Sequence, residues 1–383
     1  MAQIMTEEQE LLVEAIREFV WREVAPSVAE RDRESRCELS DFQSAFEMGF
    51  HMLEIPEEYG GSGIDFQTGA MVFEELGKVD AGYAITLVST FVAFRNVMLA
   101  GTKEQAELFA DKIRDGGLGC FAITEPGAGS DAASIRTTAV RDGDEYVLNG
   151  QKCWITNGAI ANVYLISAKT DPDAGAHGIS TFLVEADREG VSAGEHEDKM
   201  GLRTSNTCDL ILNDVRIPAD HLVGKEGEGF KIAMAGLDVS RAFMATIAVG
   251  MMQRALDEAG KYSLQRQQFG KPIMEFQMVQ DLLARMAAKT EACRALVQHT
   301  MRLIDNDYRV QKEGAITKQF VTDCLQEVAS DAVQVMGGNG YTKQYPVEKI
   351  MRDAKIFQIM EGTNQIQSIV IARQLKKEYE KQI

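Results

Sequence analysis

The stretch YVLNGQKCWITN, residues 146–157, lies in a part of the chain that begins near Gly116 and has an extended, not a helical, pattern. Residues 146–148 and 152–155 are short β-type runs, and the pair Asn149-Gly150 stands between them. An Asn-Gly pair between hydrophobic runs is a strong signal for a two-residue β-hairpin. The stretch therefore predicts a tight hairpin inside a β domain.

Further β-type runs lie on both sides of this stretch. They are GCFAIT, VYLISAK, STFLVEA and CDLILNDVRI, at residues 119–124, 163–169, 180–186 and 208–217. Turn-forming residues separate these runs, as is typical of a compact sheet. We therefore expect residues 116–228 to form an antiparallel sheet domain, either a sandwich or a barrel.

The segments before and after this domain have helical periodicity. Thr6 and Gln9 match a helix-capping box, and apolar residues then recur at helical spacing. We expect residues 1–115 to form an all-helical domain. Residues 229–383 contain two helical segments longer than twenty residues, 242–267 and 277–304. Their long apolar stripes favour a helix bundle and also suit packing between subunits.

Composition restricts the classes of function. The formal net charge of −18 argues against binding to nucleic acid or to anionic membranes, but a local basic cluster could still hold a small polyanion. No apolar run is expected to be long enough to span a membrane, and the first residues resemble neither a secretory signal nor a transit peptide. The six cysteines lack a CxxC spacing, which favours a reducing cytoplasm, and the five histidines indicate no metal site.

Five stretches could carry chemistry, and each also has a structural interpretation. The glycine-rich TEPGAGSD, residues 124–131, would suit a phosphate or form a plain loop. Trp154 could be a core residue, Arg266 a solvated charge, and the glycine pair in 334–342 a helix C-cap. In FQIMEGTNQIQ, residues 357–367, Glu361 is either an exposed loop residue or a base in a dry site.

Taken together, these stretches resemble the acyl-CoA dehydrogenase family over essentially the whole chain. The matching strings, in order, are TEPGAGSD, NGQKCWITN, RQQFGKPI, QVMGGNGY and MRDAKIFQIMEGTNQIQ. The resemblance implies a helical N-terminal domain, a middle β domain and a C-terminal four-helix bundle. It also implies an FAD between the β domain and the C-terminal helices, shared between the two subunits of a dimer.

The resemblance places the cofactor on two groups of residues, one for the flavin part and one for the ADP part. Thr124 would bond the edge of the flavin ring, Gly129 and Ser130 the pyrophosphate, and Trp154 would stack on the flavin. Residues expected to line the flavin are Phe121, Ile123, Thr124, Gly129, Ser130, Trp154, Ile155, Thr156, Thr363 and Gln365. Residues expected to hold the ADP part are Arg266, Gln268, Phe269, Phe276, Gln277, Gln334, Gly337 and Gly338.

The same resemblance identifies Glu361 as the catalytic base. It would remove the α proton of the acyl thioester while a hydride leaves the β carbon for the flavin. The Glu361 backbone N–H and a flavin ribityl hydroxyl would stabilise the enolate oxygen. Gly362 lets the backbone turn close to the ligand. Some members carry the base where this chain has Ser240, which strengthens the case for Glu361.

The residues expected to contact the acyl-CoA are Ser89, Thr90, Ser130, Asp238, Ser240, Arg241, Met360 and Gly362. For Asp238 and Arg241 the alternatives are a helix cap or ion pair and a bridge between helices. Met360 stands where the family usually has an aromatic residue, so the cavity is either wider there or filled by a neighbour. We expect a wider cavity and a short, branched or cyclic acyl group. Residues 80–90 contain no Arg, which disfavours a dicarboxylic acyl group.

Three alternatives remain at this stage: an acyl-CoA oxidase, an enoyl-CoA reductase working in the opposite direction, and a nucleic-acid-associated relative. The chain length disfavours the oxidase, and the net charge of −18 disfavours the third. We expect a bacterial cytoplasmic enzyme that passes electrons to an electron-transferring flavoprotein. A homotetramer, built as a dimer of dimers, is the expected assembly.

Overall fold

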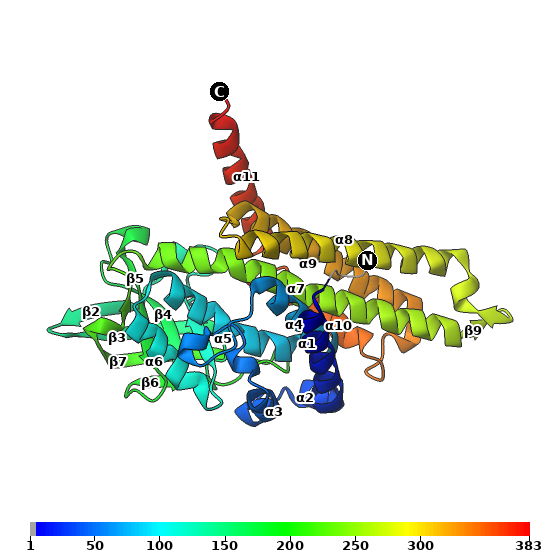
Figure 1. The fold of residues 1–383 in the computed structure, drawn as a ribbon, viewed down its shortest axis with the longest axis horizontal. Helices are drawn as coiled ribbons and strands as arrows, with labels where there is room; N and C mark the ends of the chain where they lie inside the picture. The colour runs from blue at the N-terminus through cyan, green and yellow to red at the C-terminus, as the bar shows by residue number, and fades with distance from the viewer. Residues whose placement is uncertain (1–4) are drawn as a thin grey trace.

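The computed structural model describes residues 5–383 and has the expected order of helices, sheet and helices (Figure 1). The N-terminal helices are α1 (Glu7–Phe19), α2 (Ala25–Glu34), α3 (Gln43–Glu47), α4 (Phe66–Val79), α5 (Ala81–Ala100) and α6 (Lys103–Arg114). The predicted capping box is present, because Thr6 accepts from the Gln9 N–H and Gln9 accepts from the Thr6 N–H. A π-helical turn at Val20–Val24 separates α1 from α2.

The middle domain is one mixed eight-stranded sheet. Its strands are β1 (Gly119–Ala122), β2 (Thr138–Asp142), β3 (Glu145–Thr156), β4 (Val163–Lys169), β5 (Ile179–Glu185), β6 (Val191–Ala193), β7 (Thr207–Pro218) and β8 (Leu222–Val223). The order is β6-β7-β3-β2-β4-β5-β8, with β1 beside β4. The pairings are antiparallel, as expected, except that β4 runs parallel to both β1 and β2.

The predicted hairpin at Asn149-Gly150 is wrong. Strand β3 continues through this pair, and the turn that joins β2 to β3 lies at Gly143-Asp144. The Asn149 amide instead exchanges two hydrogen bonds with Asp214 of β7, at 2.9 and 2.8 Å, where the register between the strands shifts. A Cβ on Gly150 would lie 2.4 Å from the Thr137 hydroxyl oxygen, so the glycine permits a close approach and not a turn.

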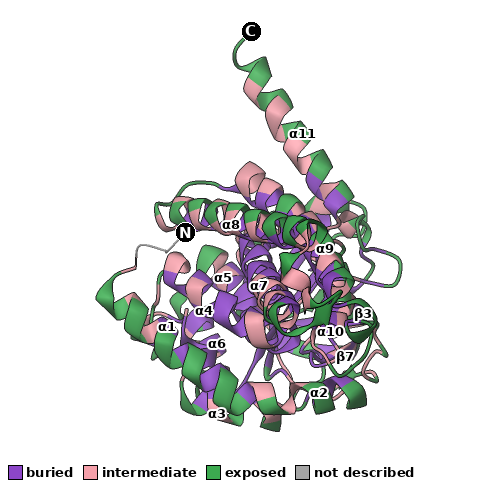
Figure 2. Cartoon of the chain, turned by 90° about the vertical axis from the view of Figure 1, so that its right-hand side faces the viewer, coloured by how far each residue is buried: buried purple, intermediate pink, exposed green. Residues whose placement is uncertain are grey.

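The C-terminal domain is built around one long helix, α7 (Gly229–Gln265). It continues into a small hairpin of β9 (Gln267–Gln268) and β10 (Lys271–Pro272), followed by α8 (Gln277–Asp305), α9 (Gln311–Met336), α10 (Val347–Phe357) and α11 (Asn364–Glu380). Figure 2 shows α7 at the buried centre, between α4 and α5 on one side and α8 and α9 on the other. Helix α11 projects away from the body of the chain (Figure 1).

Two helices qualify as membrane spans by length and composition, which contradicts the expectation that no run is long enough. They are Ala81–Ala100 and Gly229–Gln265, that is α5 and α7. Their most apolar windows are 72% and 78% buried inside the structure. Burial against neighbouring helices accounts for their apolar character, because a helix that is hydrophobic all round also suits the core of a large protein.

A buried ionic cluster joins the three domains. Asp80, at the start of α5, accepts from Lys349 of α10 and from the Thr204 hydroxyl of the β domain, both at 2.8 Å. Lys349 also pairs with Asp353 at 2.6 Å, and Asp353 accepts from the Leu202 N–H at 2.7 Å. These bonds fix α10, and with it the turn that follows α10, against both other domains.

Candidate active site

The turn between α10 and α11 has a left-handed backbone at two successive residues. Glu361 has φ +56° and Gly362 has φ +86°. This conformation is free of strain for glycine but costs a glutamate about 1 kcal/mol or more. Thr363 then caps α11 by accepting from the Ile366 N–H at 3.3 Å. Glu361 is therefore held in an unfavourable conformation, which needs support from its surroundings.

Three side chains from three helices support this turn. Gln367 of α11 donates to the carbonyl oxygens of Glu361 and Gly362, at 3.1 and 2.9 Å. Lys318 of α9 donates to the Gly362 carbonyl at 2.9 Å, and Arg241 of α7 to the Glu361 carbonyl at 3.4 Å. Sequence reasoning assigned no role to Lys318 or Gln367. Both main-chain carbonyls are thus fixed, and the Glu361 side chain is left free of this network.

The Glu361 carboxylate lies in a dry environment. Its Oε2 is buried and has no hydrogen-bond partner among the described residues. The Ser240 Oγ close by is also buried and also lacks a hydrogen-bond partner among them. Burial raises the pKa of the Glu361 carboxyl above that of an exposed glutamate. The neighbours that oppose this rise are, in decreasing order, Arg241, Ser240, Lys318 and Arg95. A carboxylate of this kind is a stronger base than one in water.

Asp238 and Arg241 are buried on α7 and form an ion pair of 2.6 Å. Both structural alternatives left open by the sequence are therefore present, since Asp238 forms an ion pair and Arg241 bridges α7 to the turn at Glu361 and Gly362. Arg309, in the segment between α8 and α9, is close enough to lower the pKa of Asp238, which burial raises.

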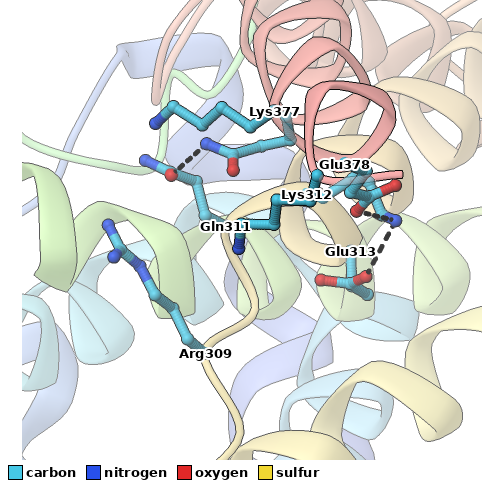
Figure 3. A pocket seen from close by; sticks show the side chains of 8 residues that line it. Arg309, Gln311, Lys312, Glu313, Lys377 and Glu378 are labelled. Carbon is cyan, nitrogen blue, oxygen red and sulfur yellow. Dashed lines mark hydrogen bonds and ion pairs between the residues drawn. The ribbon is translucent and has the colours of Figure 1, made fainter. Parts of the chain in front are cut away.

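A basic hollow of about 350 Å³ opens beside Arg309, between the start of α9 and the end of α11 (Figure 3). Four cationic and two acidic side chains line it, together with two glutamines. They are Arg309, Lys312, Lys377 and Lys381, then Glu313 and Glu378, then Gln311 and Gln374. Lys312 bridges the two carboxylates in Figure 3. The hollow is a cationic region on a chain whose net charge is −18.

The glycine-rich loop at 124–131 is built on a buried ion pair. Lys152 of β3 donates to Glu125 at 2.7 Å, and Glu125 also accepts from the Arg136 and Thr137 N–H groups at 2.5 and 3.0 Å. Burial lowers the pKa of Lys152 to about 8, against the effect of Glu125. Beyond this anchor the loop is open, because a Cβ on Gly129 would meet no atom within 4 Å. Ser130 beside it is exposed.

Trp154 does not belong to the core. Its side chain is 61% exposed, although it follows the buried Lys152 and Cys153 in β3, and its backbone is left-handed with φ +59°. The neighbouring Cys153 N–H donates to the Thr124 carbonyl at 2.9 Å, which joins Trp154's strand to the glycine-rich loop. An exposed tryptophan in a costly backbone conformation indicates a binding surface for a flat group.

The other residues of this group have different environments. Phe121 and Thr156 are half-buried, whereas Ile123 and Ile155 are buried in clusters of the β domain. The two isoleucine side chains therefore pack the interior of the domain. Ser89 is half-buried on α5, and Thr90 is fully buried and accepts from the Gly119 N–H at 3.0 Å, which joins α5 to β1. Gln365 is exposed at the start of α11.

The residues predicted to hold the ADP part lie at the other end of the molecule. Arg266, Gln268 and Phe269 form the hairpin after α7, at the end opposite the sheet in Figure 1. Phe269 is 94% exposed and packs edge-to-face with Phe276, while Gln277 is exposed. Gln334, Gly337 and Gly338 end α9 and are exposed, and the neighbouring Asn339 donates to Tyr262 of α7 at 2.6 Å. The two groups are thus separated by α7, whose 37 residues span roughly 55 Å.

Comparisons with known proteins agree with this arrangement. Residues 6–117, 120–215 and 227–376 match the N-terminal, middle and C-terminal domains of acyl-CoA dehydrogenases. The chain is 42% identical to cyclohex-1-ene-1-carbonyl-CoA dehydrogenase of Syntrophus aciditrophicus, over 97% of this chain and 90% of that protein.

Two solved structures are similar over nearly the whole chain. One is butyryl-CoA dehydrogenase from Megasphaera elsdenii, with a TM-score of 0.95, 40% identity, and coverage of 98% and 100% of the two chains. The other, reported with the electron transferring flavoprotein of Acidaminococcus fermentans, has a TM-score of 0.95, 44% identity, and coverage of 98% and 99%. The chain therefore belongs to the acyl-CoA dehydrogenase family of FAD-dependent oxidoreductases.

Proposed function

We propose that this enzyme removes the α proton and the β hydride of an acyl-CoA thioester, giving the 2,3-enoyl-CoA. The proposal rests mainly on Glu361. Its Oε2 is buried and has no hydrogen-bond partner within residues 5–383, and burial raises the pKa of its carboxyl. An α C–H next to a thioester is a weak acid, so its removal needs a base of this strength held in position.

The residues of this chain fit an FAD. The exposed Trp154, the open loop at Gly129 and Ser130, and the half-buried Thr124 and Thr156 offer a face, a phosphate cradle and hydrogen-bonding groups. When bound, FAD would accept the hydride that leaves the β carbon. Trp154 would exclude water from one side of the cofactor, and the loop N–H groups would hold its pyrophosphate.

In the proton-transfer step, Glu361 accepts the α proton of the substrate. The α C–H bond breaks, and the proton is bound at Oε2 as negative charge develops on the thioester oxygen. The Glu361 backbone N–H would donate to that oxygen, because the bonds from Gln367, Lys318 and Arg241 fix the main chain around it. Glu361 loses its negative charge when it accepts the proton. Negative charge develops on the substrate oxygen at the same time, so the net charge of the site does not change.

The substrate is proposed to be a short, branched or cyclic acyl-CoA. Met360 precedes the base where a flat aromatic side chain would close the cavity, and its unbranched side chain can yield to a ring. The cationic hollow beside Arg309 offers the phosphates of CoA a partner of opposite charge. Relatives named for a cyclic and for a butyryl thioester support this class of substrate.

The assembly is proposed to be a dimer of dimers that shares each FAD across a subunit pair. Within one chain, α7 keeps the two groups of cofactor residues at opposite ends, so a second copy must supply the ADP-binding group. Exposed apolar residues at that end, Phe269, Met278 and Tyr341, offer contact area for it. An electron-transferring flavoprotein is the proposed acceptor, supported by the similarity to a chain solved with such a protein.

Anaerobic mixing with acyl-CoAs tests the proposal. Butyryl-, isobutyryl-, cyclohexanecarbonyl- and palmitoyl-CoA would be added in turn, and loss of flavin absorbance near 450 nm followed with product analysis. We expect the first three to bleach the flavin and form enoyl-CoA, and palmitoyl-CoA to react poorly. An enzyme that no thioester reduces would refute the proposal. Peroxide formed in air at the turnover rate would identify an oxidase instead.

A further inference from the structure

A buried arginine lies next to the active site, and the proposed reaction assigns it no role. Arg95 of α5 has a side chain only 9% exposed. Glu54, in the turn before α4, accepts from its Nε at 2.8 Å and its Nη2 at 2.5 Å. Its Cζ also lies 4.0 Å from the centre of the Phe243 ring. These contacts from two sides fix the guanidinium in one orientation.

Nη1, on the free edge of the guanidinium, is buried and has no hydrogen-bond partner among the described residues. It carries two N–H donors, and a buried donor in a folded protein almost always has an acceptor, which may be protein, water or ligand. Glu54 does not supply it, because its bonds are made to Nε and Nη2 on the opposite edge of the guanidinium. The Arg95 side chain thus presents an open pair of donors.

These donors belong to the region of the catalytic base. Arg95 is close enough to Glu361 to lower the pKa of its carboxyl, in opposition to burial. Phe243, on which Arg95 stacks, lies one turn along α7 from Ser240. The Ser240 hydroxyl, like Arg95, lowers the pKa of the Glu361 carboxyl. In the part of the chain that the structure describes, three buried polar atoms of this region therefore lack hydrogen-bond partners: Arg95 Nη1, Ser240 Oγ and Glu361 Oε2.

We propose that Arg95 determines substrate specificity by donating hydrogen bonds to an oxygen on the acyl group, beyond the β carbon. The proposal rests on the proposed function and narrows its substrate class to oxygen-bearing acyl-CoAs.

Charge decides which kind of oxygen fits. Glu54 already neutralises Arg95, so the pair as a whole carries no net charge. A hydroxyl or carbonyl oxygen accepts from Nη1 without adding charge. A carboxylate would bring a second anion next to the buried Glu54, whose pKa burial already raises. The site therefore favours a neutral acceptor over a dicarboxylic acyl group.

Matched substrates test this inference on the holoenzyme. The pairs are hexanoyl- and 5-hydroxyhexanoyl-CoA, and cyclohexanecarbonyl- and 4-hydroxycyclohexanecarbonyl-CoA, with adipyl-CoA as the anionic arm. We expect the wild type to favour at least one hydroxylated partner by about 10–100-fold in kcat/KM, the range that one hydrogen bond to a charged group gives. The Kd values of the 3-thia analogues, which bind but cannot be desaturated, should follow the same order.

The variant Arg95→Leu with Glu54→Leu removes both charges and leaves no unpaired ion. In this double variant the preference should fall to about twofold or less. The matched control is Arg294→Leu with Glu74→Leu, a buried pair between α8 and α4 outside the site, which should keep the preference. Arg95→Lys tests geometry, because lysine keeps the charge but loses the planar fork, and the preference should fall there too.

The outcomes separate this inference from the proposed function. A wild type that does not distinguish either pair, or a double variant that keeps the preference, overturns the role of Arg95 while the flavin is still bleached by plain acyl-CoAs. Preference for adipyl-CoA over both hydroxylated substrates overturns the neutral-acceptor assignment. A flavin that no thioester reduces refutes the proposed function itself.

Discussion

Lys318 Nζ lies 2.9 Å from the carbonyl oxygen of Gly362, so a fully buried lysine holds the backbone of the turn at Glu361 and Gly362. A second bond of 2.9 Å to the Asn364 side chain fixes the same nitrogen to the start of α11. Because Glu361 has a left-handed backbone, removal of this support should let the turn relax toward an ordinary conformation.

We therefore predict that Lys318→Met lowers kcat by about tenfold or more while FAD stays bound. The pKa seen in the acid limb of the kcat–pH profile should also rise, because Lys318 lowers the pKa of Glu361 in the wild type. Lys376→Met, at an exposed lysine of α11, serves as the control. An unchanged pH profile with only a lower melting temperature would mean that Lys318 is purely structural.

The pKa of Lys318 also predicts a pH-dependent stability difference. Burial lowers this pKa to about 8 from the usual 10.5, so between these values the unfolded chain binds the proton and the folded chain does not. Stability contributed by this group therefore rises with pH across that window. The free energy of unfolding of the wild type, measured relative to Lys318→Met by denaturant titration, should increase between pH 8 and 10. A constant difference would contradict the buried position.

Glu361→Gln should lose activity and gain stability. We expect kcat to fall by about 10²–10⁴-fold, because glutamine keeps the shape of the side chain but accepts no proton. The folded-state pKa of Glu361 is raised, so ionisation of this group lowers the stability of the fold, and this cost disappears as the pH falls through the raised pKa. Calorimetry at pH 7.5 should show a higher melting temperature for the variant. Near-normal turnover would place the base elsewhere.

Trp154→Ala should weaken FAD binding without unfolding the protein. Its side chain is 61% exposed in the free chain, so little packing is lost. Stacking by an aromatic ring contributes about 0.5–1.5 kcal/mol beyond buried area, which corresponds to at least a severalfold increase in Kd for FAD. The chain has one other tryptophan, Trp21, which packs on Arg254, and Trp21→Ala is the matched control. Equal FAD retention by both variants would exclude a flavin contact.

Met360→Tyr should restore a flat wall beside the thioester. We expect kcat/KM for cyclohexanecarbonyl-CoA to fall by about tenfold or more, because overpacking a cavity by a ring costs about 1–3 kcal/mol. Butyryl-CoA, which is narrow at the α and β carbons, should be affected little. A parallel loss for both thioesters would show that Met360 does not shape the cavity.

Phe269→Asp should disrupt assembly and FAD binding together. The side chain is 94% exposed in one chain, so its replacement leaves the fold of that chain intact. In the proposed assembly, the aspartate would place an unpaired charge at the subunit contact and beside the cofactor. Sedimentation and flavin content should both fall, whereas Leu11→Asp, at an exposed position of α1, should change neither. A flavin-loaded oligomer would refute the shared site.

The sequence predicted the order of the domains because periodicity and turn residues are local properties. It failed at Asn149-Gly150, where local preference favours a turn but pairing with β7 on both sides keeps β3 continuous. Here tertiary contacts override the propensity of two residues. The left-handed Trp154 and Glu361 lay equally beyond prediction, since nothing in their residue types favours that backbone.

The site was only partly predictable for a related reason. Sequence motifs named Glu361, but they gave no indication of the charges that surround it. A lysine on a helix is usually solvated, so the sequence does not indicate that Lys318 is buried, as the structure shows it to be. Arg95 did leave a signal, because it interrupts the apolar run FVAFRNVM at residues 91–98. A charged residue within such a run indicates either a helix end or a buried partner, here Glu54.

The length of α7 has a genetic consequence. If each FAD takes its flavin-binding group from one chain and its ADP-binding group from another, the changes Trp154→Ala and Arg266→Ala fall in different halves of a shared site. A mixed dimer of the two variants would then contain one site with both defects and one site with neither. Coexpression of two defective alleles should therefore restore FAD to up to half of the sites in such dimers, a form of intersubunit complementation.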